Sequence, residues 1–458
     1  MGRLNLDEEF EKVFKSFTKN EIKKSYAMDS RSLYENIIAS ESRSQGLDIH
    51  NLEIEPSHEY ELQKKIRPLF NKEGVNTSKI GIPHQFIGLG FDEEPLKKHY
   101  ACTFFFDIKG STRLSLLYDL EDVFTFKNSI IQVCIEIIRS LDGHVHRIMG
   151  DAVMAFFIGN GKSKEDAIAD AINCATTLKY VIEDKLKPWL EGQGFESQDI
   201  GFRIGCDFGD DDQIIWGGFG YSNVGEISAA GLPVDMASKL QNRSSKNNAM
   251  LGENLIDYVN WPNKYSKLKT TLNNGQTQIE DIVKPNITNR DKEPLNYKMK
   301  LLDFDKYIEL SPLPSEYRER ISNHIITNNN INFTCEYLTG DNWVEYISAS
   351  MFLEKQLKLR FTISASTRGS LKFPLKIVFS KTNHGPETPE KERDIKCVSE
   401  TKTLNATRTS QYNKSIPPYV KTHIDEGTEY RGLHTMECEI KDSSSAIIYR
   451  DIIGVLIK

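Results

Sequence analysis

The sequence contains no long apolar run and no recognisable targeting segment. No stretch approaches the roughly 20 consecutive apolar residues that a membrane-spanning helix requires. The first nine residues are acidic and lack the apolar core of a signal peptide. Leu6 also stands where an N-myristoylation motif requires Ser or Thr. These absences predict a cytoplasmic protein without a membrane span.

Cysteine is sparse, and its positions are scattered. The 458 residues include seven cysteines and no Cys-x-x-Cys pair, which argues against a zinc cluster and a disulfide framework. The formal net charge of −7 disfavours nucleic acid as a partner. Most of the cysteines stand among apolar residues and are expected in the core. The seven are Cys102, Cys134, Cys174, Cys206, Cys335, Cys397 and Cys438.

Length and pattern divide the chain into four stretches. A chain of this length, 39% hydrophobic, predicts two or three soluble domains. Residues 1–95 are charged and mostly helical in pattern, and residues 96–262 alternate strand and helix signals. Residues 263–300 have the composition of a linker or an irregular excursion. Residues 301–458 favour β-structure, with a long polar surface loop expected over 383–428.

The first chemical motif follows a buried strand. Residues 99–106 are aromatic and β-favouring, and Asp107 comes directly after them. Gly110, Ser111 and Thr112 then form a turn into a helix. Backbone N–H groups at such a turn can hold phosphate oxygens, so this motif predicts a carboxylate beside a phosphate cradle.

The second motif lies at the tip of a predicted strand pair. Asp151 follows Gly150, between a strand over 143–149 and a strand over 152–157. If adjacent strands bring Asp151 beside Asp107, the two carboxylates can hold two Mg²⁺ or Mn²⁺ ions. Each motif alone is weak evidence, because a strand-terminal Asp is more often a helix cap or a solvated turn.

A third motif follows in a helix expected over 231–241. The three motifs, in this order, resemble those of the catalytic domain of class III adenylate and guanylate cyclases. The hallmarks of that family are Phe-x-Asp-Ile-x-Gly-x-Thr, then Gly-Asp, then Gly-x-x-Val-Asn-x-Ala-x-Arg-Leu. The resemblance covers about 96–262 and implies an α+β protein: a ferredoxin-like α/β sandwich, followed here by a β-rich, sandwich-like domain. It implies two Mn²⁺ or Mg²⁺ ions per active site, held by Asp107, Asp151 and the Ile108 carbonyl. It places the phosphates at Gly110, Ser111 and Thr112.

Two positions depart from the family pattern. The family's Asn, which orients the ribose, is Asp235 here, and its Arg, which stabilises charge on the α-phosphate, is Lys239. Lysine keeps the charge but loses the bidentate fork. Sites of this family lie between two catalytic domains, so the resemblance implies a head-to-tail homodimer. Asp107 and Asp151 of one chain then face Asp235 and Lys239 of the other.

Arg147 and Ser228 occupy the family's base-reading positions. Adenylate cyclases have Lys with Asp or Thr there, and guanylate cyclases have Glu with Cys. The Arg–Ser pair matches neither, and it resembles the bacterial pyrimidine cyclases of Pycsar anti-phage systems. Arginine only donates hydrogen bonds, whereas cytosine presents acceptors at O2 and N3 and uracil carries a proton on N3. We therefore favour CTP, with cyclic CMP as the product, over UTP.

Several alternatives remain open from the sequence. They are a uridylate cyclase, a purine cyclase with an unusual pocket, and a nucleotide-binding sensor with a degenerate site. The segment 430–440 resembles part of a C-terminal sensor domain that accompanies some bacterial defence cyclases. That resemblance implies a β-rich module that binds a nucleotide-like ligand, although a purely structural β-domain is equally consistent with the residues. The resemblance to the pyrimidine cyclases implies a second messenger that a separate effector protein reads.

Overall fold

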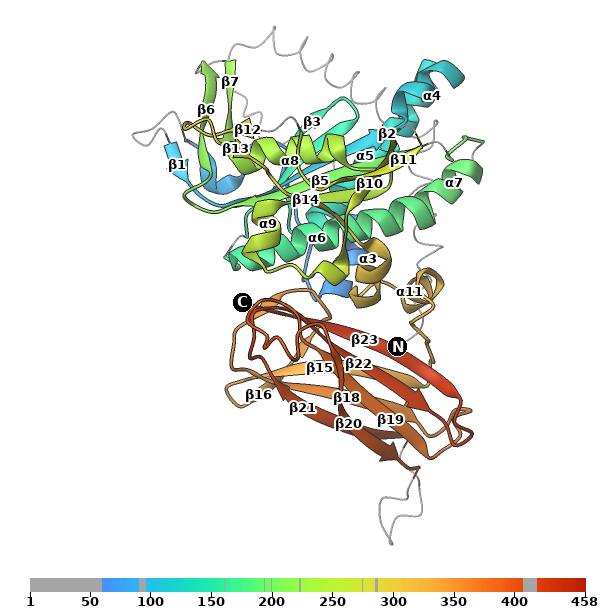
Figure 1. The fold of residues 1–458 in the computed structure, drawn as a ribbon. Helices are drawn as coiled ribbons and strands as arrows, with labels where there is room; N and C mark the ends of the chain where they lie inside the picture. The colour runs from blue at the N-terminus through green and yellow to red at the C-terminus, as the bar shows by residue number, and fades with distance from the viewer. Residues whose placement is uncertain are drawn as a thin grey trace, which may run out of the picture.

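The structure is a computed structural model, and its two lobes are shown in Figure 1. It describes residues 60–89, 96–159, 161–192, 194–198, 200–221, 224–273, 275–284, 287–406 and 418–458. The helical pattern expected over 1–95 therefore lies largely outside the described residues. Within them, α3 (Glu61–Ile66) continues into the 3₁₀ helix η2 (Arg67–Phe70), which contains Pro68, and η3 (His84–Phe86) follows.

The upper lobe is built on a seven-stranded sheet with strand order β3-β4-β2-β5-β8-β14-β9. Its first part, β2-α5-β3-β4-α6-β5, has the βαββαβ order and the antiparallel pairing of a ferredoxin-like unit. The predicted fold class is confirmed. The strands are β2 (Ala101–Lys109), β3 (His144–Met149), β4 (Ala152–Phe157), β5 (Gly201–Gly209), β8 (Asn248–Gly252), β9 (Ser266–Lys267) and β14 (Met299–Leu302).

Helices cover both faces of this sheet. Helix α5 (Leu120–Ser140) buries residues at helical spacing, from Val123 to Ile137, against one face together with α6 (Lys164–Tyr180). A capping box begins α6, because Ser163 and Asp166 exchange hydrogen bonds. The other helices of this lobe are α4 (Ser111–Leu117), the π-helix η4 (Val181–Leu186), α7 (Lys187–Gly192), α8 (Leu232–Arg243), α9 (Glu253–Tyr258) and η5 (Asn263–Tyr265).

Helix α8 packs on the opposite face, where Gly205 of β5 permits its close approach. A Cβ on Gly205 would lie 2.1 Å from the Ala237 carbonyl oxygen and from the Gln241 nitrogen. Beside this face, a smaller sheet with order β1-β6-β7 comprises β1 (Leu96–Lys98), β6 (Ile215–Tyr221) and β7 (Val224–Ala230). Its core residue Trp216 stacks on Phe86, with ring centroids 4.0 Å apart.

The segment 263–300, expected to be a linker or an irregular excursion, folds against the catalytic sheet. Besides β9 and the start of β14, it contains β10 (Lys269–Asn273), β11 (Gln276–Glu280), β12 (Ile287–Thr288) and β13 (Pro294–Leu295). The Tyr297 hydroxyl donates to the Asp207 carboxylate at 2.5 Å. Burial raises the pKa of Asp207 to about 7 although this hydrogen bond opposes the shift.

The lower lobe is a β-sandwich, as expected for 301–458. One sheet has the order β16-β15-β18-β21 and the other β17-β23-β22-β19-β20. The strands are β15 (Ile331–Thr339), β16 (Asn342–Tyr346), β17 (Phe352–Leu353), β18 (Lys358–Ser366), β19 (Leu375–Thr382), β20 (Lys396–Leu404), β21 (Tyr419–Gly427), β22 (Gly432–Lys441) and β23 (Ile447–Ile457). The prediction of a long surface loop over 383–428 was wrong, because the strands β20 and β21 both lie within this range.

The two lobes share a buried contact along α6. The Asn173 side chain donates to the Ala349 carbonyl at 2.8 Å and accepts from the Tyr307 hydroxyl at 3.0 Å. Asp166 accepts from the backbone N–H of Phe352 at 2.7 Å. The short helices α10 (Phe304–Tyr307), η6 (Ile308–Leu310) and α11 (Ser315–Ile321) connect the lobes. In the described part of the chain, no helix is long and apolar enough to cross a membrane.

Candidate active site

Asp107 lies near the end of the central strand β2. Its neighbours in register are Ala152 on β4 and Arg203 on β5. The apolar side chains of Phe104 and Phe106 are fully buried and fix the strand in the core. The carboxylate is thereby held at the edge of the core, where it is largely but not completely buried.

The β3–β4 turn brings Asp151 to the same edge of the sheet. The backbone N–H of Ile108 donates to the carbonyl of Asp151 at 3.2 Å, which ties the turn to the strand that carries Asp107. Gly150 has a φ of 65°, a conformation that glycine adopts readily. The buried Ser111 hydroxyl donates to the Asp151 carboxylate. The structure thus brings together Asp107, Ile108, Ser111 and Asp151.

Arg203 adds a cation that the sequence reasoning did not assign a role. Its guanidinium donates to the Asp107 carboxylate through Nε at 3.0 Å and through Nη2 at 2.5 Å. A single carboxylate oxygen receives both bonds, so the other oxygen of Asp107 is not engaged by Arg203. The sequence carried two signals. Residues 202–209 resemble the Arg-Ile-Gly-x-x-x-Gly strand of class III cyclases, and Arg203 stands in an apolar strand, where a charged side chain needs a partner.

The potential metal ligands of this site suit an ion that is also bound by nucleotide phosphates better than an ion that is enclosed by protein side chains. Among the described residues, no group of three or more His, Cys, Asp or Glu side chains has the geometry to hold a metal ion. Mg²⁺ is commonly bound by one or two carboxylates together with substrate phosphates. Two carboxylates and the Ile108 carbonyl fit that requirement, so the residues present are compatible with the expected cations.

Arg147 is held by a residue that the sequence analysis missed. Its guanidinium, on β3, forms an ion pair with Glu226 on β7. Ser228 is two residues further along the same strand, so both side chains emerge on one face of β7. Ser228 is buried, whereas Arg147 and Glu226 are partly exposed. This spacing of two was the signal that could have identified Glu226.

Asp235 and Lys239 lie apart from this group on helix α8. They are four residues apart, so they share one face of the helix, and both are exposed. Within the described residues, neither side chain makes a hydrogen bond or ion pair. The remaining turn residues, Gly110 and Thr112, lie at the start of α4, where Gly110 has a φ of 92°.

This fold and the paired aspartates define a class III nucleotidyl cyclase. A cytidylate cyclase of Escherichia coli is 40% identical over 456 residues, covering 98% of each chain. A cytidylate cyclase of Staphylococcus aureus is 34% identical and covers 86% of this chain and 87% of its own. The chain therefore belongs to the cytidylate cyclase family.

The C-terminal lobe and the fold have further relatives. Residues 305–458 match the family model described as "Adenylyl/Guanylyl and SMODS C-terminal sensor domain". Among solved structures, the adenylyl cyclase CyaB from P. aeruginosa is 18% identical with a TM-score of 0.36, covering 45% of this chain and 95% of that chain. The guanylyl cyclase Cya2 is 15% identical with a TM-score of 0.34, covering 44% and 91%.

Proposed function

We propose that this chain is a cytidylate cyclase that converts CTP into 3′,5′-cyclic CMP and pyrophosphate. The observation that carries the proposal is the β3–β4 hairpin, which presents Arg147 on one strand and Asp151 at its tip. A base-reading cation and a metal-binding carboxylate are therefore four residues apart on one rigid element. The cytidylate cyclases at 40% and 34% identity support the choice of CTP.

In this proposal Asp107, Asp151 and the Ile108 carbonyl hold two Mg²⁺ or Mn²⁺ ions. When bound, the cations polarise the triphosphate and favour loss of the proton from the 3′-hydroxyl. Ser111 positions Asp151 through its hydrogen bond. Gly110 and Thr112 support the phosphates through the turn before α4. Arg203 orients Asp107 and keeps a positive charge beside the triphosphate.

Arg147 and Glu226 together match the edge of cytosine. The guanidinium donates to the acceptors O2 and N3, and the Glu226 carboxylate accepts from the exocyclic N4 amine. Uracil offers a donor at N3 and an acceptor at O4. The donor Arg147 would therefore meet another donor, and the acceptor Glu226 would meet another acceptor. A purine is larger and needs space that the arginine side chain fills. Ser228 can bond either pyrimidine and does not discriminate.

The active site is completed by a second copy of the chain. Asp235 and Lys239 are exposed on α8, where a head-to-tail homodimer can bring them to the partner's Asp107 and Asp151. Asp235 then orients the ribose, and Lys239 neutralises charge that develops on the α-phosphate. We further propose that cyclic CMP acts in the cytoplasm as a second messenger for anti-phage defence, read by a separate effector protein.

Release of pyrophosphate from CTP separates this proposal from a non-catalytic nucleotide sensor. Purified chain with Mn²⁺ is expected to release one pyrophosphate for each cyclic CMP formed, and chelation by EDTA is expected to abolish both products. A sensor with a degenerate site binds CTP, shown by calorimetry, without releasing pyrophosphate. That result would contradict the proposal.

Glu226→Gln is expected to relax the choice between CTP and UTP. The amide of glutamine can donate to uracil O4 as well as accept from cytosine N4, and it no longer fixes Arg147 by charge. The ratio of kcat/KM for CTP to that for UTP is expected to fall about tenfold, equivalent to about 1.4 kcal/mol. Steady-state assays with each nucleotide measure this ratio.

Glu439→Gln is the matched control for this variant. Glu439 forms a cross-strand pair with Arg450 in the C-terminal lobe, with the guanidinium donating at 2.8 Å and 3.1 Å. This control removes a similar charge pair far from the base and is expected to leave the nucleotide ratio unchanged. An unchanged ratio in Glu226→Gln as well would show that Glu226 is a surface partner of Arg147 without a role in selection.

A further inference from the structure

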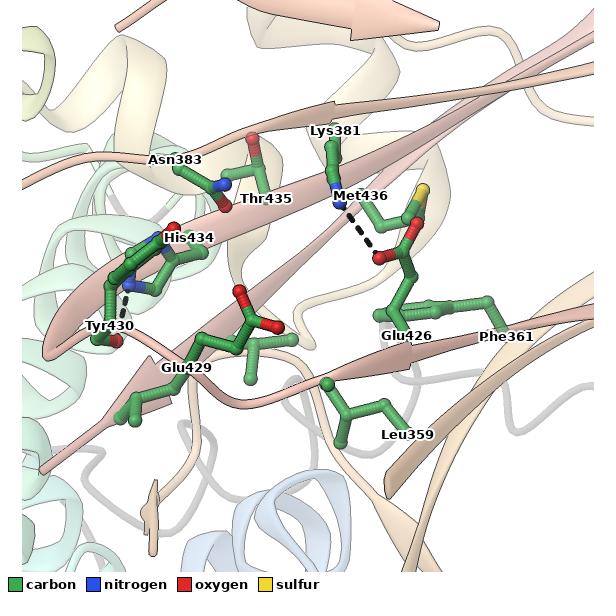
Figure 2. Close-up of a pocket in the computed structure, with 13 residues that line it drawn as sticks. Leu359, Phe361, Lys381, Asn383, Glu426, Glu429, Tyr430, His434, Thr435 and Met436 are labelled. Atoms are coloured by element: carbon green, nitrogen blue, oxygen red, sulfur yellow. Dashed lines mark hydrogen bonds and ion pairs between the residues drawn. The ribbon is translucent and has the colours of Figure 1, made fainter. Parts of the chain in front are cut away.

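A pocket opens between the two sheets of the C-terminal sandwich, at the end that faces the catalytic lobe (Figure 2). The space inside it that water-sized molecules can occupy is about 70 Å³, and its mouth is open to solvent. Its apolar side is formed by buried residues from both sheets, namely Leu359, Phe361, Met436, Val455 and Ile457. Such a lining suits the apolar body of a small ligand.

The polar side of the pocket carries an excess of negative charge. Lys381 pairs with Glu426 at 2.9 Å, so these two charges offset each other. The exposed carboxylate of Glu429 points toward the space between them and the apolar wall (Figure 2). Within the described residues, Glu429 makes no hydrogen bond or ion pair. Glu429 therefore leaves the charged lining residues with a net negative charge, so this side favours a cation.

His434 does not supply a compensating charge. It is buried in the pocket wall, and burial lowers its pKa to about 4. The neutral ring satisfies both nitrogens, because Nδ1 accepts from the His384 backbone N–H at 3.3 Å and Nε2–H donates to the Tyr430 carbonyl at 2.7 Å. A proton added to Nδ1 of His434 would point at the backbone N–H of His384, so protonation is unfavourable. The pocket therefore stays net negative at neutral pH.

We propose that this pocket binds a small organic cation, an ammonium or guanidinium group attached to an apolar body. The charged group pairs with Glu429, and the apolar part packs against Phe361 and Met436. The side-chain amide of Asn383, which also lines the pocket, offers both a donor and an acceptor to a polar substituent. An anionic nucleotide or phosphate meets unfavourable charge here.

The pocket wall continues directly into the contact with the catalytic lobe. Tyr430 lines the pocket, and the next residue, Arg431, crosses to the other lobe. The Arg431 guanidinium donates to the Tyr258 carbonyl at 2.8 Å and to Glu165 in the first turn of α6 at 3.1 Å. A ligand that engages Glu429 and Tyr430 therefore acts on the segment that holds Arg431, and through it on the cyclase rate. This regulatory step rests on the proposed function, whereas binding does not.

A charge series of one skeleton tests binding on the full chain. The probes are 2-phenylethylamine, 2-phenylethanol and 3-phenylpropionate, measured by ligand-observed NMR titration. The cation is expected to bind at least about tenfold more tightly than the anion, with the alcohol between them. Glu429→Gln is expected to remove most of that difference, and Glu345→Gln, at an exposed position on β16, is expected to retain it. No binding of the cation, equal binding of the anion, or an unaltered ratio in Glu429→Gln would overturn the proposal.

Activity measurements test the coupling separately. Saturating 2-phenylethylamine is expected to change the rate of cyclic CMP formation at least about threefold. Arg431→Ala is expected to abolish this response while probe binding persists. An unchanged rate of cyclic CMP formation at saturating probe would overturn the coupling. A change of rate that persists in Arg431→Ala would also overturn it. If the chain forms no cyclic nucleotide at all, the proposed function fails, and the binding series still decides whether the pocket takes a cation.

Discussion

Asp107→Asn is expected to lower kcat for cyclic CMP formation about a thousandfold, a loss of about 4 kcal/mol in transition-state stabilisation. Asparagine keeps the shape of the side chain and can still accept a hydrogen bond from Arg203. It lacks the negative charge with which a carboxylate strengthens its bond to a divalent cation. Asp151→Asn is expected to behave in the same way, because the backbone bond from Ile108 holds both residues at one edge of the sheet. Steady-state assays with CTP and Mn²⁺ measure the effect.

Thermal unfolding separates this loss from a folding defect. Asp107 forms an ion pair with Arg203 in a partly buried setting, so Asp107→Asn can lower the melting temperature by a few degrees. The matched control is Asp341→Asn, in the exposed turn between β15 and β16, and it is expected to retain full activity. A folded Asp107→Asn chain with activity within about tenfold of the original would contradict the role of Asp107 as a metal ligand.

Mixing two inactive variants is expected to restore activity. In a head-to-tail dimer, Asp107 of one chain and Lys239 of the other serve the same site. A dimer of one Asp107→Asn chain and one Lys239→Ala chain therefore has one doubly defective site and one intact site. Random pairing of equal amounts makes half the dimers mixed, so about a quarter of the original activity is expected.

The measurement uses co-expressed variants with different affinity tags, purified in tandem. The tandem-purified heterodimer is expected to show about half the original activity per dimer, while each variant alone stays near background. A heterodimer as inactive as its parents would contradict a site shared between chains. The exposure of Asp235 and Lys239 on α8 makes this test informative, because no described contact within one chain engages them.

The predictions that succeeded rest on local patterns with a physical cause. The aromatic, β-favouring strand before Asp107 is determined by residues close together in the sequence. The turn at Gly150 and Asp151 could be predicted because it joins two strands that are adjacent in the sequence. These elements place Asp107 and Asp151 at one sheet edge, which the sequence order alone had indicated.

The predictions that failed or were not made involve long-range contacts. Arg203 and Glu226 acquire partners 96 and 79 residues away. A local pattern can indicate that such a residue is of interest, but it does not specify its partner. The strands β20 and β21 were taken for loop because polar and charged residues outnumber apolar residues in each of them. β-structure depends on pairing with other strands, so composition alone understates it.

Competition among all four nucleotides tests the central claim most directly. Purified chain is incubated with equimolar ATP, GTP, CTP and UTP and Mn²⁺, and the cyclic products are identified by mass spectrometry. Cyclic CMP is expected as the dominant product, exceeding cyclic UMP at least about tenfold. Predominance of cyclic UMP would contradict the reading of cytosine by Arg147 and Glu226, and predominance of a purine product would contradict the whole assignment of the base pocket.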